Sequence, residues 1–259
     1  MANYDILGNI AIVKFLDDTP LAEKLAKAEE LLKNPSITTV LEKTDKVHGR
    51  LRTIKTRFIL GKDTLVALYN ESKCRFKLNV ETCYFSPRLA HERLDVSRMV
   101  KKKDKVLVMF AGVAPFSIVI AKNSNPKSVV SVELGKDCNK YAQENIILNK
   151  VQDKVVHIQG DVKNVIPKIV KSGGKFDLVV MARPNLKETF LKEGLMASKK
   201  GSKIIYYGFS SEAKKDEMIL NLEKEAKKLK RKIKILKCLE AGDIAPYEHR
   251  YRIEISVLN

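Results

Sequence analysis

The sequence has no tryptophan, only four cysteines and no long apolar run. The cysteines are scattered without CxxC spacing, which is typical of buried thiols in a reducing cytosol rather than of a disulfide framework. No segment approaches the ~20 apolar residues that cross a bilayer, and the N-terminus lacks the basic and apolar blocks of a signal peptide. We therefore expect a soluble cytoplasmic protein with no membrane contact.

Positive charge is what the chain has in excess. Lys and Arg total 49 against 31 Asp and Glu, which gives a formal net charge of +18 spread along the whole length. A soluble protein this basic usually meets a polyanion, most often nucleic acid. The alternative is a lysine-rich proteome whose charged faces are merely solvated. We favour nucleic acid as the partner.

The hydrophobic pattern changes near residue 87 and divides the chain in two. Residues 1–86 are predicted to form a small α+β domain that binds RNA, with short strands around a helix that has Thr19 as its N-cap and Pro20 in its first turn. Residues 87–259 alternate apolar β-rich runs with helical stretches, which indicates a mostly parallel sheet with helices on both faces. Its predicted strands lie at 105–110, 129–134, 154–159, 176–181, 202–209, 232–241 and 249–258. The predicted class is therefore α/β, with a seven-stranded Rossmann-like domain.

The loop after the first of these strands, FAGVAPF (110–116), limits the ligand. It has one glycine, Gly112, whereas a dinucleotide fold needs GxGxxG to bring its backbone against a pyrophosphate. A nucleoside ligand without phosphates fits better, and S-adenosylmethionine is the common one. Glu133 ends the second strand, where an acid that binds ribose belongs. Asp161 follows the third, where a carboxylate can accept a hydrogen bond from the adenine amino group.

Six motifs stand in order along the chain: HGRLR (48–52), YFSPRLAHER (84–93), VLVMFAGVAPFSI (106–118), VVSVEL (129–134), ENIILNK (144–150) and GDV (160–162). With them the chain resembles the archaeal and eukaryotic tRNA guanosine-37 N1-methyltransferases, a family related in fold to the wybutosine-pathway aminocarboxypropyl transferases. The resemblance runs from about residue 45 onward. It implies a class I methyltransferase domain, S-adenosylmethionine as cofactor and tRNA as substrate. We expect a monomer without the extra N-terminal domain of long family members.

The resemblance also implies which residues surround the cofactor. They are Tyr84, Arg93, Phe110, Ala111, Gly112, Val113, Pro115, Phe116, Glu133, Leu134, Asp161, Val162 and Pro184. No metal is expected, because methyl transfer from a sulfonium needs none.

The candidate catalytic residues are Glu92, Arg88 and Arg52. N1 of guanine carries a proton at neutral pH, and a desolvated carboxylate such as Glu92 can remove it. Arg88 lies one helical turn before Glu92, so both can face one cleft, although a surface salt bridge is the alternative for this pair. An arginine opposite O6 stabilises the negative charge that develops there. The resemblance places Arg52 in that role.

Three departures from the family pattern leave alternatives open. Val108 replaces an aspartate, Ala114 replaces a glycine, and Ala182-Arg183-Pro184 stands where the family has Asn-Leu-Pro or Asn-Pro-Pro. The family asparagine helps to hold the target base. Asn185, three residues further on, is a poor substitute, and Arg183 can serve a different base or a substrate carboxylate.

The sequence therefore predicts a tRNA methyltransferase that acts on N1 of the guanosine 3′ of the anticodon. The first alternative is a wyosine-pathway enzyme that methylates a tricyclic base or transfers an aminocarboxypropyl group to the same nucleoside. The intact YFSPRLAHER argues against the second of these reactions. The other alternative is an RNA-binding relative that has lost catalysis.

Overall fold

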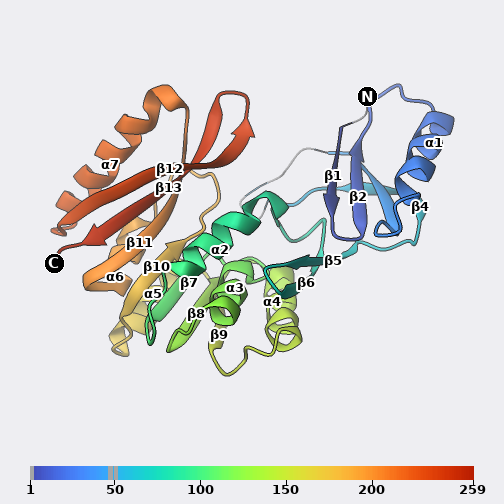
Figure 1. Ribbon diagram of the computed structural model, residues 1–259. Coiled ribbons are helices and arrows are strands. Elements are labelled where there is room, and N and C mark those ends of the chain that lie inside the picture. The colour runs from blue at the N-terminus through green and yellow to red at the C-terminus, as the bar shows by residue number, and fades with distance from the viewer. Residues whose placement is uncertain (1–2, 46–48, 50–51) are drawn as a thin grey trace.

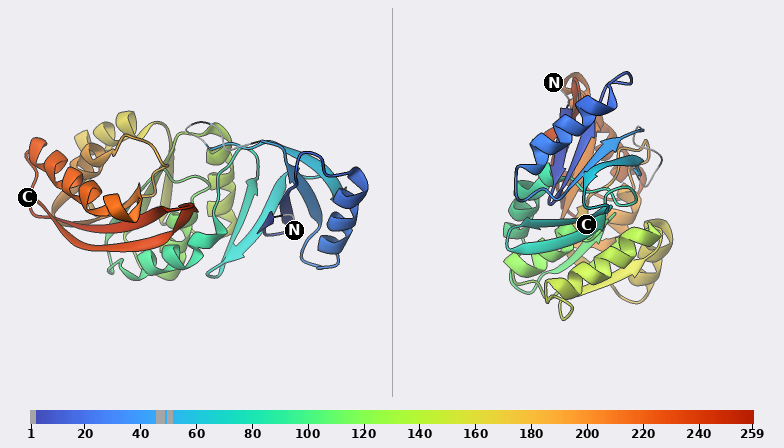
Figure 2. Two further views of the ribbon diagram at one scale, coloured as in Figure 1. Left: turned by 90° about the horizontal axis from the view of Figure 1, so that it is seen from above. Right: turned by 90° about the vertical axis from the view of Figure 1, so that its right-hand side faces the viewer.

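The computed structural model describes residues 3–45, 49 and 52–259. Most of the HGRLR motif (48–52) therefore lies outside the described residues, although Arg52 is among them. The molecule is elongated, with a small sheet at the N-terminal end and a larger sheet at the other (Figures 1 and 2). None of the described helices is long and apolar enough to cross a membrane.

The small sheet has four strands in the order β1-β2-β3-β4. They are β1 (Asn3–Leu7), β2 (Ile10–Lys14), β3 (Thr39–Lys43) and β4 (Thr56–Gly61). Helix α1 (Leu21–Leu32) connects the parallel pair β2 and β3, and its buried Ala28 and Leu31 pack with Val40 of β3. The helix begins directly after Pro20, whose fixed φ favours a helix start.

A separate hairpin, β5 (Val66–Glu71) and β6 (Cys74–Asn79), lies against helix α4 (Lys136–Leu148). Asn145 accepts a hydrogen bond from the backbone N–H of Lys77 at 2.8 Å and donates to its carbonyl at 3.0 Å. Asn149, just after α4, makes the same two bonds to Arg75 at 2.8 and 2.6 Å. The two amides thus satisfy an edge of β6 that lacks a neighbouring strand. This explains the two asparagines of ENIILNK.

The large sheet has seven strands in the order β12-β13-β11-β10-β7-β8-β9. Their bounds are β7 (Lys105–Met109), β8 (Ser128–Glu133), β9 (Val155–Gln159), β10 (Phe176–Met181), β11 (Ser198–Ser210), β12 (Ile233–Ala245) and β13 (Glu248–Val257). All pairs are parallel except that β13 runs antiparallel to both β11 and β12. The predicted α/β class with a mostly parallel seven-stranded sheet is confirmed.

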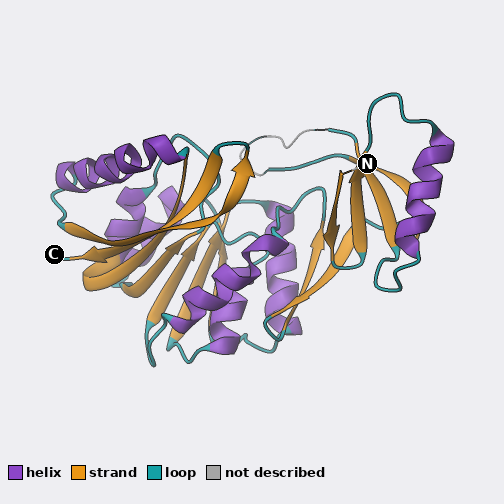
Figure 3. Cartoon of the chain, turned by 45° about the horizontal axis from the view of Figure 1, so that its top comes forward, coloured by secondary structure: helices purple, strands orange, loops and turns teal. Residues whose placement is uncertain are grey.

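Helices cover both faces of this sheet (Figure 3). Helices α2 (Ala90–Arg98), α3 (Pro115–Asn123) and α4 share one apolar core with it. The other core contains α5 (Val162–Lys171), α6 (Leu191–Ala197) and α7 (Lys215–Lys228). Single 3₁₀ turns precede α2 (Pro87–Leu89) and α7 (Glu212–Lys214).

Candidate active site

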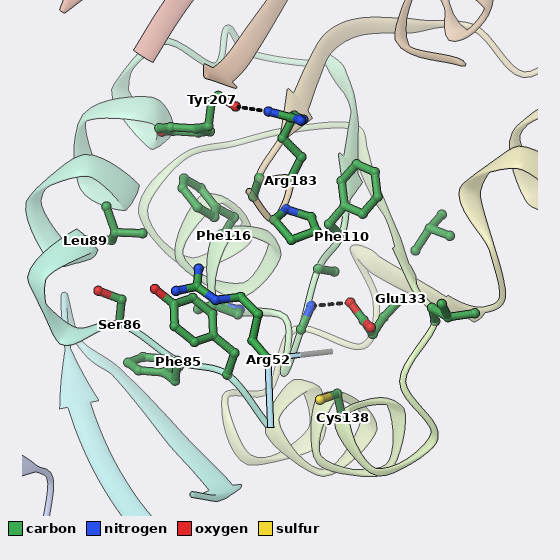
Figure 4. Close-up of a pocket in the computed structure, with 18 of the residues that line it drawn as sticks. Arg52, Phe85, Ser86, Leu89, Phe110, Phe116, Glu133, Cys138, Arg183 and Tyr207 are labelled. Carbon is green, nitrogen blue, oxygen red and sulfur yellow. Dashed lines mark hydrogen bonds between the residues drawn. The ribbon is translucent and has the colours of Figure 1, made fainter. Parts of the chain in front are cut away.

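A cavity opens at the carboxyl ends of β7, β8 and β10, lined by residues of the loops that follow them (Figure 4). The strand order reverses here, because the chain proceeds from β7 to β8 and β9 on one side and then crosses to β10 on the other. This is the point at which open α/β sheets bind their ligands. Tyr84, Phe85 and Ser86 line the cavity from the loop before α2, and Tyr207 and Arg250 line it from β11 and β13.

The turn after β7 is unusually tight. Phe110, Gly112 and Ala114 all have left-handed backbone conformations, with φ of +61°, +56° and +66°. Each non-glycine residue in this region costs about 1–2 kcal/mol, so surrounding contacts must hold the turn. One of them is the hydrogen bond from the Gly112 N–H to Glu133 Oε2 at 2.8 Å.

Glu133 joins the two loops that form the cavity floor. Its Oε2 accepts from Gly112 and its Oε1 accepts from the Gly135 N–H at 2.7 Å. The residue is 9% exposed and lines the cavity (Figure 4). Each carboxylate oxygen has a second lone pair, so Glu133 can accept from a ribose diol while it holds both loops.

We expect Glu133→Ala to weaken S-adenosylmethionine binding by about 1.5–3 kcal/mol, because charge-assisted hydrogen bonds to the ligand are lost. Calorimetric titration measures the change. Glu144→Ala is the matched control, since that carboxylate lies on the outer side of α4 and pairs with Lys77 at 3.2 Å. An unchanged dissociation constant for Glu133→Ala would contradict the proposed seat of the ribose.

All of the predicted cofactor residues line the cavity except Val113 and Asp161. Val113 differs from the prediction because its side chain is buried in the core, 1% exposed, and its carbonyl accepts from Asn145 Nδ2. Asp161 begins α5, where its Oδ1 accepts from the Lys163 N–H at 2.9 Å as an N-cap. Its neighbours Gly160 and Val162 do line the cavity, so a contact of Asp161 with adenine stays a prediction.

Two of the departures from the family pattern do not reach the cavity. Val108 is fully buried in the core beneath α2, α3 and α4, and Ala114 is fully buried at the start of α3. Neither side chain lines the cavity. Val108 and Ala114 therefore give no support to the hypothesis of an inactive relative.

Arg88 does not share a cleft with Glu92. Its side chain is 77% exposed and its Nη2 lies 2.8 Å from Asp5 Oδ1 of β1. The prediction assumed a continuous α-helix, but Pro87–Leu89 form a 3₁₀ turn before α2 begins at Ala90. Because a 3₁₀ turn has 3.0 rather than 3.6 residues, the two side chains no longer lie on one face. The predicted placement of Arg88 was wrong, and a surface ion pair fits it.

Glu92 lies directly behind a residue of the cavity wall. Its Oε1 accepts from Arg252 Nη1 at 2.7 Å and from Tyr207 Oη at 3.0 Å, and Tyr207 lines the cavity. Among the described residues, no hydrogen bond reaches Oε2 of Glu92. Burial raises the pKa of Tyr207 well above its usual value, so this phenol stays protonated and donates. One carboxylate oxygen is thus fixed, and the other makes no hydrogen bond to a described residue. Glu92 itself is not among the residues that line the cavity, so its contact with a substrate stays a prediction.

Three arginines surround this end of the cavity. The Arg52 guanidinium lies 3.7 Å from the centre of the Tyr84 ring, and Arg250 Nη2 lies 3.4 Å from Tyr84 Oη (Figure 4 shows Arg52). Arg252 holds Glu92. Sequence reasoning missed Arg250 and Arg252, although the alternation in HRYRIE places both on one face of a strand.

Arg93 lines the cavity, but its guanidinium is already paired. It donates from Nε and Nη2 to the two oxygens of Glu71 on β5, both at 2.5 Å, and from Nη2 to the Ser86 carbonyl at 3.1 Å. Both side chains are almost fully buried. This pair fastens the β5–β6 hairpin to α2 and to the loop that carries Tyr84.

Arg183 closes the loop after β10 rather than replacing the family asparagine. Its Nη2 donates to the carbonyls of Leu186 and Glu188, and its Nη1 donates to the carbonyl of Tyr207 at 3.4 Å. Burial lowers the pKa of this guanidinium. Asn185 is exposed, and the cavity wall at the asparagine position is the methyl group of Ala182.

One group among the described residues has metal-ligand spacing. Ligand atoms of Glu240, Asp243 and His249 lie within 4.8 Å of one another near the tip of the β12–β13 hairpin. His249 Nδ1 already lies 2.7 Å from Asp243 Oδ1. None of the three lines the cavity, so the candidate active site does not include them.

The reversal of strand order, the single-glycine turn and the carboxylate at the end of β8 together define a class I methyltransferase. Residues 67–236 match the TRM5/TYW2 methyltransferase domain, and the chain belongs to this family.

Relatives with known names support this placement. The chain is 33% identical over 258 residues to the tRNA (guanine(37)-N(1))-methyltransferase Trm5b of Pyrococcus abyssi, covering 98% of this chain and 74% of the relative. It is 30% identical over 305 residues to the tRNA (guanine(37)-N(1))/4-demethylwyosine(37)-methyltransferase Taw22 of Nanoarchaeum equitans, covering 99% of this chain and all of the relative. The structure of aTrm5 in complex with tRNA-Leu superposes with a TM-score of 0.85 at 25% identity, covering 99% of this chain and 72% of that one.

Proposed function

We propose that the protein is an S-adenosylmethionine-dependent tRNA methyltransferase that methylates N1 of guanosine 37, the nucleoside 3′ of the anticodon. The observation that carries the proposal is one cavity with two chemically different ends. One end has Glu133, whose carboxylate can accept from a ribose diol. The other end is lined by Arg52, Arg250 and Tyr207, and the carboxylate of Glu92 lies behind Tyr207 and accepts its hydrogen bond. The two named relatives act on position 37 of tRNA, which supports this assignment.

The residues at the Glu133 end fit the cofactor. Leu134, Val162 and Pro184 give an apolar wall for adenine, and the single-glycine turn offers no cradle for phosphates. When bound, S-adenosylmethionine supplies an electrophilic methyl group on a sulfonium, which needs no metal.

The residues at the other end fit the guanine. The base must leave its stack to enter the cavity, and the free Oε2 of Glu92 then takes the N1 proton. Arg252 and Tyr207 hold the opposite oxygen, which fixes the direction of the carboxylate. Arg52, which packs on the Tyr84 ring, lines the same cavity and would oppose the charge that grows on O6. The aromatic rings of Tyr84 and Phe85 also line the cavity and could stack on the base, but Phe85 already packs on Tyr69 and Phe76.

The same proposal covers the rest of the chain. Residues 1–86 form an accessory domain that contacts the tRNA, residues 87–259 form the methyltransferase domain, and the protein acts as a cytoplasmic monomer. The net charge of +18 supports contact with a polyanion.

Incubation with labelled S-adenosylmethionine and an unmodified tRNA transcript, followed by mass spectrometry of the nucleosides, tests the activity. We expect 1-methylguanosine from a transcript with guanosine at position 37 and none when that position is adenosine. Label in any other nucleoside, or in none, would contradict the proposal.

A second candidate is methylation of a tricyclic wyosine-pathway base at the same position. The small Ala182 favours it, because this wall of the cavity has neither the bulk nor the amide of an asparagine. Taw22 of Nanoarchaeum equitans is named for both reactions. The same assay with tRNA that carries 4-demethylwyosine distinguishes the two substrates, since only the second candidate predicts label in the tricyclic nucleoside.

A further inference from the structure

Arg250 of β13 is a mostly buried cation that forms no ion pair with a described carboxylate. It is 7% exposed and lines the cavity. Its one hydrogen bond to a described residue is the 3.4 Å contact with Tyr84 Oη, and no described carboxylate lies within ion-pair distance of it. The Phe209 ring, 5.6 Å away, adds only a weak cation–π contact. A guanidinium has five N–H donors, so most of those on Arg250 make no hydrogen bond to a described residue.

A second positively charged side chain, Arg52, lies close to Arg250. The guanidinium of Arg52 rests on the face of the same Tyr84 whose hydroxyl contacts Arg250. Two positive groups on one small wall favour a ligand that is rich in acceptors or negatively charged. Because Arg250 is buried in the wall rather than exposed at the rim, a ligand inside the cavity fits better than a solvated phosphate outside it.

The position along β13 ties Arg250 to the catalytic carboxylate. Residues two apart on a strand point to the same face, about 6–7 Å from each other along the strand. Nη1 of Arg252, two residues further along the strand, lies 2.7 Å from Oε1 of Glu92. Arg250 is therefore placed beside the group that faces N1 of the base.

The loop after β10 has no side chain that could orient the target base in the way that the family asparagine does. With Ala182 at the wall and Arg183 bonded to backbone carbonyls, this chain presents no amide to the base at that position. Arginine forms a bidentate pair with O6 and N7 of guanine, and those atoms lie on the edge adjacent to N1.

We propose that Arg250 binds the target guanine through O6 and N7 and so replaces the missing asparagine as the group that orients the base. The inference rests on the proposed function. O6 has two lone pairs, so Arg52 and Arg250 can both donate to it, and the charge that develops on O6 after N1 loses its proton strengthens both hydrogen bonds. Only Arg250 would contact N7, so a preference for guanine over 7-deazaguanine would depend on Arg250.

The test uses two full-length tRNA transcripts, one with guanosine and one with 7-deazaguanosine at position 37, under single-turnover conditions. Wild-type enzyme should methylate the 7-deaza transcript about 10- to 100-fold more slowly, because one arm of the bidentate pair is lost. Arg250→Met should lower the rate on guanosine by a similar factor and should show no further penalty for the 7-deaza base. Arg98→Met is the control, since Arg98 is 69% exposed, pairs with Asp95 and is not among the residues that line the cavity.

Each outcome decides a different point. If wild-type enzyme does not methylate the guanosine transcript, the proposed function fails. If it does so but treats both bases alike, or if Arg250→Met keeps the full 7-deaza penalty, the assignment of Arg250 fails. Cofactor affinity and melting temperature of Arg250→Met are measured in parallel. Should that variant not fold, Arg250→Lys, which keeps the charge but not the fork, must lose the N7 penalty.

Discussion

Glu71→Ala is expected to lower the free energy of unfolding by about 3–5 kcal/mol. The substitution leaves Arg93 charged and almost fully buried without its carboxylate, and an uncompensated buried charge is strongly destabilising. The Ser86 carbonyl alone cannot replace two charge-assisted bonds. Urea titration followed by circular dichroism measures the change.

The double variant Glu71→Leu/Arg93→Met is the control. Apolar replacement of both members of a buried ion pair is often near neutral, so most of the stability should return. If Glu71→Ala alone cost less than 1 kcal/mol, the pair would not be the fastening between the β5–β6 hairpin and α2 that its geometry suggests.

Glu92→Gln is expected to reduce single-turnover methyl transfer by about 10²–10⁴-fold. The amide keeps the shape of the side chain but cannot take the N1 proton, and this range is the usual contribution of general-base catalysis. Cofactor and tRNA affinities should change little, because the loss falls on the chemical step. Rapid-quench assays with saturating enzyme measure it.

A substitution at an exposed residue supplies the control for Glu92→Gln. Arg98→Met should behave as wild type. A Glu92→Gln enzyme with the wild-type rate would mean that the carboxylate only braces Tyr207 and Arg252.

Local patterns were enough to predict the large sheet and the meeting of Gly112 and Glu133 at one edge of it. Each parallel strand is a compact apolar run, and residues that follow such strands meet at one edge whatever the helices between them do. Glu133 and Gly112 could therefore be placed together, and the structure joins them by a hydrogen bond of 2.8 Å. Strand β1 of the small sheet was not predicted, because four of its five residues are exposed and its sequence therefore shows no apolar alternation.

The catalytic end could not be predicted in the same way, because its contacts join distant segments. Glu92 and Arg252 are 160 residues apart, and nothing local to either one reveals the other. Arg88 was misplaced by a single 3₁₀ turn, which spacing alone cannot distinguish from the first turn of an α-helix. The ion pair between Arg93 and Glu71 could not be predicted either. In the sequence Glu71 is only the last residue of a short strand, and the pair forms only when the β5–β6 hairpin packs against α2.

The order of synthesis gives strand β13 a particular consequence. Of the elements described above it is the last to leave the ribosome, yet it inserts between β11 and β12 and carries both Arg250 and Arg252. A nascent chain can complete β7, β8 and the Glu133 turn while Glu92 still lacks its brace. Completion of β13 is therefore the step that brings Arg252 to Glu92 and Arg250 into the cavity wall.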